Sequence, residues 1–142
     1  MPDGAIAVEI GDAQGHDVDA AALMGQVRLS MRAIAAHEPD PATVLTRTNE
    51  LPGGPVLGVV PDTEYREETF TLDKDSALIM VTDGVVEGPG LTLEAGLERA
   101  GTLAGAALHD GLNTEETADR ILDAAVAVDH ADDVAVLVIQ RT

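Results

Sequence analysis

The sequence predicts one α+β domain, because two kinds of apolar pattern alternate along its 142 residues. In four segments the apolar residues recur at the spacing of a helix face, and in three short segments they alternate or run together as in strands. Clusters of glycine, proline and aspartate separate most of the segments. An apolar share of 45% is enough for a buried core, and the length fits a single core, so we expect one domain over residues 1–142.

Residues 5–10 predict the first strand. Ile6, Val8 and Ile10 share one face and Glu9 lies on the other, which is the period-two pattern of a strand. A Gly-Asp pair follows and ends the strand. We interpret Glu9 as a solvated side chain, with a supporting role behind the site residues as the alternative.

Two helices are predicted next. Residues 19–37 carry apolar side chains at helical spacing and acids in the first turn, which stabilise a helix N-terminus. Asp40 before Pro41 is typical of an N-cap followed by proline at the first helical position, and predicts a helix to about Glu50. The glycine- and proline-rich residues 51–55 then break the pattern and precede a short apolar run.

The second half of the chain predicts two more strands and two more helices. Residues 77–82 form a buried strand that an Asp-Gly pair ends, and residues 134–139 form a last strand that two aspartates open. Between these strands, residues 93–108 and 115–128 show helical spacing, and Thr114 is expected as the N-cap of the later helix.

Charge and composition narrow the function classes. The formal net charge of -18 would repel a phosphate backbone, so nucleic acid is not expected as a partner, whereas such a field concentrates divalent cations. The absence of cysteine excludes disulfides, thiolate metal sites and cysteine nucleophiles. No apolar run reaches the roughly 20 residues of a membrane helix, and the N-terminus lacks a signal-peptide pattern, so we expect no membrane contact and a cytoplasmic location.

Aspartates at strand ends are the candidate functional residues. Asp12 follows the first predicted strand, Asp83 follows the second, and Asp132 and Asp133 precede the third. Carboxylates brought to one sheet edge from distant parts of a chain supply the oxygen ligands that Mg²⁺ and Mn²⁺ prefer. Each aspartate alone also has a structural interpretation, because Asp-Gly is a common turn pair and Asp often caps backbone N–H groups.

Four short motifs accompany these aspartates: GDAQGH at residues 11–16, AAALM at 20–24, TDGVVE at 82–87 and DDVAVL at 132–137. In order and context they resemble the motifs of the PPM-type (protein phosphatase 2C-like) serine/threonine phosphatases, in the branch of the stage II sporulation protein E phosphatases. Residues 40–49 and 55–59 also look like this family, so the resemblance covers nearly the whole chain.

The resemblance implies an α-β-β-α sandwich of two mainly antiparallel sheets flanked by helices, with a two-metal site at one edge. By position, Asp12 would bridge two Mn²⁺ or Mg²⁺ ions with the Ala13 carbonyl as a further ligand, and Asp83 and Asp132 would complete the coordination of one ion. A metal-bridging water would then attack the phosphorus of phosphoserine or phosphothreonine, which makes the three aspartates the implied catalytic residues. Asp133 is a further metal ligand or, alternatively, orients its neighbour or caps the strand.

The chain departs from the family pattern at two places. Residues 2–4 look like the hairpin turn that follows the family's first strand, so that strand and its Gly-Gly-Asp ligand motif are expected to be absent. Residues 49–51 stand where the family has further central strands. We therefore expect some central strands to be missing, and a homodimer or a rearranged sheet to cover the exposed sheet edges. His16 is either a general acid to the leaving oxygen or only a polar neighbour of Asp17.

The function that the resemblance implies is a metal-dependent protein serine/threonine phosphatase, acting on a phosphorylated regulatory protein such as an anti-sigma-factor antagonist. One alternative is a non-catalytic phosphatase-fold module that binds a partner, because the loss of a ligand removes turnover before it removes a docking surface. Another is an aspartyl-phosphate phosphohydrolase with Asp83 as its nucleophile.

Overall fold

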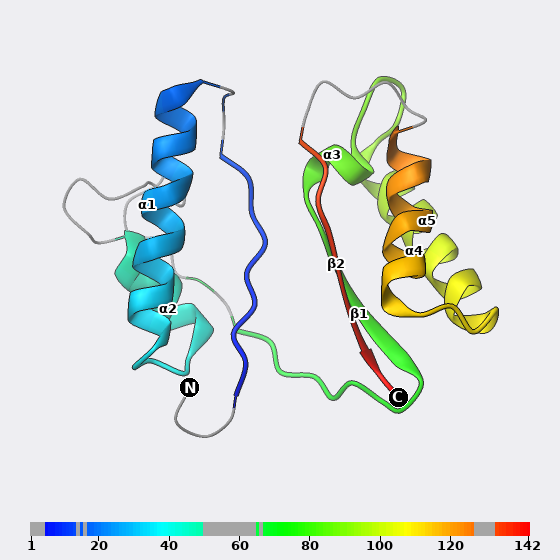
Figure 1. The fold of residues 1–142 in the computed structure, drawn as a ribbon, viewed down its shortest axis with the longest axis horizontal. Coiled ribbons are helices and arrows are strands. Elements are labelled where there is room, and N and C mark those ends of the chain that lie inside the picture. Colours follow the sequence, from blue (N-terminus) through cyan, green and yellow to red (C-terminus); the bar gives the residue numbers. More distant parts are fainter. Residues whose placement is uncertain (1–4, 14, 16, 50–64, 66, 127–132) are drawn as a thin grey trace. The chain divides into compact units, whose positions relative to one another are not determined.

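Helices and strands occupy different parts of the chain, with two helices in the first half and a helix-covered strand pair in the second (Figure 1). This computed structural model describes residues 5–13, 15, 17–49, 65, 67–126 and 133–142. It divides into two compact units, Met1–Thr69 and Phe70–Thr142. The mixture of helix and antiparallel strand confirms the α+β class, whereas the two-sheet sandwich and the single domain stay predictions.

In the first unit, helix α1 (Val18–Ala35) confirms the long helix that the apolar spacing predicts. Its N-cap is Asp17, whose carboxylate accepts a hydrogen bond from the Ala20 N–H at 2.8 Å and so satisfies a backbone donor of the first turn. Asp17 therefore caps a helix, and its carboxylate serves the fold at this position.

Helix α2 (Pro41–Asn49) packs against α1 and begins where the sequence predicts. The Asp40 carboxylate accepts hydrogen bonds from the N–H groups of Ala42 at 3.3 Å and Thr43 at 2.9 Å, which confirms Asp40 as the N-cap. The end expected at Glu50 lies just outside the described residues.

Residues 5–10 do not form the predicted strand. They have no regular secondary structure, and two of their three alternating apolar side chains are exposed, Ile6 by 86% and Val8 by 45%, while Ile10 is half-buried. A strand requires a neighbouring strand for its backbone hydrogen bonds, and the described residues of the first unit contain helices only. The prediction was wrong because alternation identifies a face but supplies no partner.

In the second unit, strand β1 (Ser76–Val81) pairs with strand β2 (Val136–Arg141) in antiparallel register, with the first residue of each strand opposite the last of the other. Both predicted strands are confirmed, although the last one begins two residues later than expected. At this end the Ala135 N–H donates to the Thr82 hydroxyl at 2.9 Å and not to a backbone carbonyl, so the regular ladder ends at the pair Val81 and Val136.

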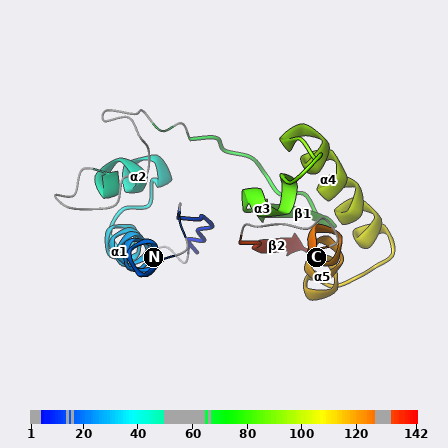
Figure 2. The same ribbon diagram turned by 90° about the horizontal axis from the view of Figure 1, so that it is seen from above.

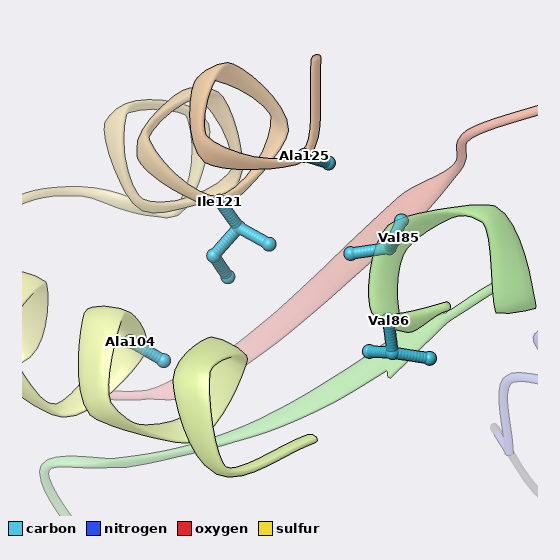
Figure 3. Close-up of a cluster of buried hydrophobic side chains, with 5 residues drawn as sticks. All are labelled: Val85, Val86, Ala104, Ile121 and Ala125. Carbon is cyan, nitrogen blue, oxygen red and sulfur yellow. The ribbon is translucent and has the colours of Figure 1, made fainter. Parts of the chain in front are cut away.

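Three helices build the core of the second unit together with the strands. They are α3 (Asp83–Val86), α4 (Leu93–His109) and α5 (Thr114–Val126). Figure 2 shows α4 and α5 beside the strand pair, and α5 contacts β2 while α4 contacts both α3 and α5. The buried side chains, drawn in Figure 3, come from all three helices: Val85, Val86, Ala104, Ile121 and Ala125. Ile79, Val81 and Val136 of the strands pack against them.

Two features of this unit were not predicted. The short helix α3 follows β1 almost directly, where the sequence indicates only a turn. At the start of α5, Asn113 rather than Thr114 is the cap: Asn113 Oδ1 accepts from the Glu116 N–H at 3.0 Å, and Glu116 Oε2 accepts from the Asn113 N–H at 2.9 Å. None of the described helices is long and apolar enough to cross a membrane.

Candidate functional site

Asp83 is the first residue of α3 and lies just beyond the end of β1. The apolar run of β1 ends at Val81, and the Thr82 carbonyl then accepts a hydrogen bond from the Val85 N–H at 3.0 Å, which starts the helical turn. The Asp83 side chain is exposed, and its Oδ1 accepts from the Gly84 N–H at 2.9 Å. The strand end thus presents an accessible carboxylate.

Asp133 lies beside this position, on the segment that leads into β2. Its carbonyl oxygen accepts a hydrogen bond from the Thr82 hydroxyl at 3.1 Å, across 51 residues of sequence. Asp133 is itself exposed. The structure therefore brings the Thr82-Asp83 junction and Asp133 together at one end of the strand pair. Asp132, the neighbouring candidate ligand, lies outside the described residues.

Asp12 and Ala13 belong to the first unit. Asp12 is exposed, and its Oδ1 accepts a hydrogen bond from the N–H of Ala13 at 2.7 Å, while Ala13 is half-buried. The assignment of Asp12 as a bridging ligand, with the Ala13 carbonyl beside it, stays a prediction. Glu9 is exposed, in agreement with a solvated side chain, and His16 lies outside the described residues.

The donor set fits a hard divalent cation in its chemistry. Every candidate side chain is a carboxylate, and the only other expected ligand is a backbone carbonyl. Both are oxygen donors of the kind that Mg²⁺ and Mn²⁺ bind. Within the described ranges, no group of three or more His, Asp or Glu side chains is placed to hold a metal ion. Asp83 and Asp133 are two acids that the described residues bring to this end of the strand pair.

Thr82 is the residue of this site that sequence reasoning missed. It is 7% exposed, and its hydroxyl both donates to Asp133 and accepts from Ala135, so it joins the two acidic segments. The available signal was a threonine between a buried strand and an Asp-Gly pair, but that position does not reveal which distant backbone the hydroxyl contacts.

The comparison with protein families bears on what this site is. The model of one family of PPM-type phosphatase domains matches the chain over residues 2–51 and 49–142. The chain belongs to this family, stage II sporulation protein E (SpoIIE). The two matching segments overlap at residues 49–51, the position where central strands of the family are expected to be missing. No curated protein and no solved structure gives a significant match.

Proposed function

We propose that this chain is a Mn²⁺- or Mg²⁺-dependent protein serine/threonine phosphatase. The observation that carries the proposal is the junction of Thr82, Asp83 and Asp133 at one end of the strand pair, in a chain of the SpoIIE family. Two exposed aspartates start there from backbone segments that the Thr82 hydroxyl joins, and carboxylates are ligands that such cations take.

The residues proposed to hold the cations are Asp12, Asp83, Asp132 and Asp133, with the Ala13 carbonyl. When bound, divalent cations lower the pKa of water and stabilise the charge on a phosphoryl group during transfer. The protein's own contribution is to hold carboxylates at fixed backbone positions, and the Gly84 N–H bond to Asp83 restricts that side chain to part of its rotamer range.

The substrate we propose is a phosphorylated regulatory protein of the anti-sigma-factor antagonist type. This substrate class is chosen from the family membership alone, and no contact among the described residues supports it. A phosphoserine peptide is therefore the appropriate first substrate, because it carries the ester bond without the contacts of a particular partner.

The test is hydrolysis of p-nitrophenyl phosphate and of a phosphoserine peptide with and without Mn²⁺. We expect Mn²⁺-dependent turnover that falls by more than about 100-fold in Asp83→Asn and in Asp12→Ala, since even supporting residues of metal sites change activity by 10- to 100-fold. Asp119→Asn is the matched control, because Asp119 is an exposed acid on α5 and its replacement removes the same charge away from the site.

The outcomes separate the competing functions. A folded protein that binds Mn²⁺ but turns over neither substrate contradicts the phosphatase and favours a partner-binding module. Recovery of a phosphorylated Asp83 by mass spectrometry would instead identify a covalent aspartyl-phosphate mechanism.

A further inference from the structure

Thr82 occupies the N-cap position of α3 without acting as a cap. A threonine at this position ordinarily accepts a hydrogen bond from an N–H group of the first helical turn. The Thr82 side chain makes no such bond, although its backbone has the extended conformation of a cap. The role of this buried hydroxyl therefore lies elsewhere.

The hydroxyl bonds to the opposite segment of the chain. Its oxygen accepts a hydrogen bond from the Ala135 N–H at 2.9 Å, and it donates to the Asp133 carbonyl at 3.1 Å. The Thr82 N–H adds a third bond, to the Ala135 carbonyl at 3.1 Å. A single residue thus makes three bonds across the end of the strand pair.

The register of the strands explains why a side chain is needed here. Val81 lies opposite Val136, so the next pair in the ladder is Thr82 and Ala135, and in a regular antiparallel ladder these two would exchange two backbone bonds. The Thr82 carbonyl is used by the Val85 N–H of α3 instead. The Thr82 hydroxyl replaces this carbonyl as the acceptor for the Ala135 N–H. The chain can therefore start α3 while the two segments remain joined.

We propose that Thr82 is a positioning residue of the metal site, fixing Asp83 and the Asp133 backbone relative to each other through its hydroxyl. This inference rests on the proposed function. Asp83 adjoins Thr82 in the chain, and Asp133 is held at its carbonyl, so one buried side chain couples the starting positions of both carboxylates. Ligands that are held in place before binding lose less conformational freedom when a cation arrives.

The test compares Thr82→Val with Thr82→Ser in the full chain. Valine keeps the shape of threonine but has no hydroxyl, whereas serine keeps the hydroxyl. We expect the affinity for Mn²⁺, measured by calorimetry, to fall at least about 10-fold in Thr82→Val and to be largely retained in Thr82→Ser. In the metal-free protein, the Ala135 amide proton is expected to exchange slowly in wild type and faster in Thr82→Val.

Thr117→Val provides the control for a general loss of stability. Thr117 is fully buried on α5, and its hydroxyl donates to the Asn113 carbonyl at 2.8 Å, so valine there also removes a hydrogen bond from the second unit. Because the described contacts of Thr117 include no hydrogen bond to Asp83 or Asp133, we expect Thr117→Val to leave the affinity for Mn²⁺ unchanged.

Each outcome bears on a different claim. Wild-type protein that binds no Mn²⁺ overturns the proposed function and this inference with it. Equal affinity in wild type and Thr82→Val, or an equal loss in Thr117→Val, overturns the role of Thr82 alone. If Thr82→Val does not fold, the wild type still decides: an Ala135 amide that exchanges without protection contradicts the bond on which the role depends.

Discussion

At the start of α2, the Asp40 carboxylate receives hydrogen bonds from the Thr43 side chain and from the N–H groups of Thr43 and Ala42. These bonds favour the ionised form, and the bond from the Thr43 hydroxyl contributes most, so they lower the pKa of Asp40 below its ordinary value of 3.8 in spite of an opposing desolvation. The start of α2 therefore stabilises the charged form of the Asp40 side chain more than the neutral form.

This lowered pKa predicts a pH dependence of the helix start. Because the pKa is lower in the folded state, the cap stabilises α2 above pH 3.8, and that contribution is lost as the pH falls through the lowered value. We expect the Thr43 amide resonance to titrate with a midpoint below 3.8 in an NMR pH series. Asp40→Asn keeps a capping oxygen that does not titrate, so the same transition in that variant, or a midpoint at or above 3.8, contradicts the assignment.

Single residues were predictable where their role depends on near neighbours. Asp40 was identified as a cap because Pro41 beside it marks the first helical position. Asn113 was missed because a shift of one residue in the helix start changes which side chain caps it. Thr82 was missed because its partners lie more than 50 residues further along the chain. Asp83 was chosen correctly as a strand-end residue, while its metal role stays a prediction.

The contact between α3 and α4 depends on a glycine. A Cβ atom at Gly96 would overlap the backbone carbonyl of Val86, whereas Gly101 and Gly105 on the same helix have open space at that position. Val86 is a buried residue of the core, three positions from Asp83 on α3. The close approach at Gly96 therefore sets where α3, and the carboxylate that it carries, lies against α4.

Gly96→Ala tests this packing. We expect it to lower the free energy of unfolding by about 2 kcal/mol or more, because the backbone of α3 has to move away. Gly101→Ala and Gly105→Ala are the matched controls and are expected to raise that free energy by about 0.5–1 kcal/mol, the ordinary gain from replacing glycine within a helix. Urea unfolding measures all three, and a stabilised Gly96→Ala would show that the two helices do not approach as closely as described.

A helix or strand could be predicted from the sequence to the extent that its backbone hydrogen bonds lie within the element itself. Helices bond within themselves, so the spacing of apolar residues located α1, α2, α4 and α5 to within a few residues. Strands depend on partners: residues 77–82 and 5–10 both have strand-like patterns, but only the former meet a neighbouring strand among the described residues. The short helix α3 has no pattern of its own and arises where the Thr82 carbonyl bonds to Val85.

At the scale of the whole molecule, the family was predictable because its motifs are short and lie in a fixed order along the chain. The sandwich was not established in the same way. A second sheet depends on pairing between segments far apart in sequence, and the described strands form one two-stranded sheet. The sequence motifs therefore identify the family, although they do not determine which strands pair.

The charge of the chain leads to a final prediction. The 26 acids outnumber the 8 bases, and the described residues contain one ion pair, between Arg120 and Asp110 at 3.0 Å, in which both side chains are substantially exposed. Such a pair contributes only about 0–1 kcal/mol, so repulsion among the remaining acids opposes folding. Salt screens this repulsion, since the Debye length falls from about 30 Å at 0.01 M to about 3 Å at 1 M.

We therefore expect NaCl to raise the thermal midpoint of unfolding. Relief of about 1 kcal/mol corresponds to a rise of roughly 4 °C for a chain of this size. Chloride is chosen over sulfate, because sulfate stabilises proteins by exclusion from their surface whatever their charge. Replacing the exposed acids Asp119 and Asp123 of α5 by asparagine should reduce the response to salt, because fewer repulsions remain to be screened. A midpoint that is constant or falls between low and high NaCl would show that the acids are spaced too widely to repel one another appreciably.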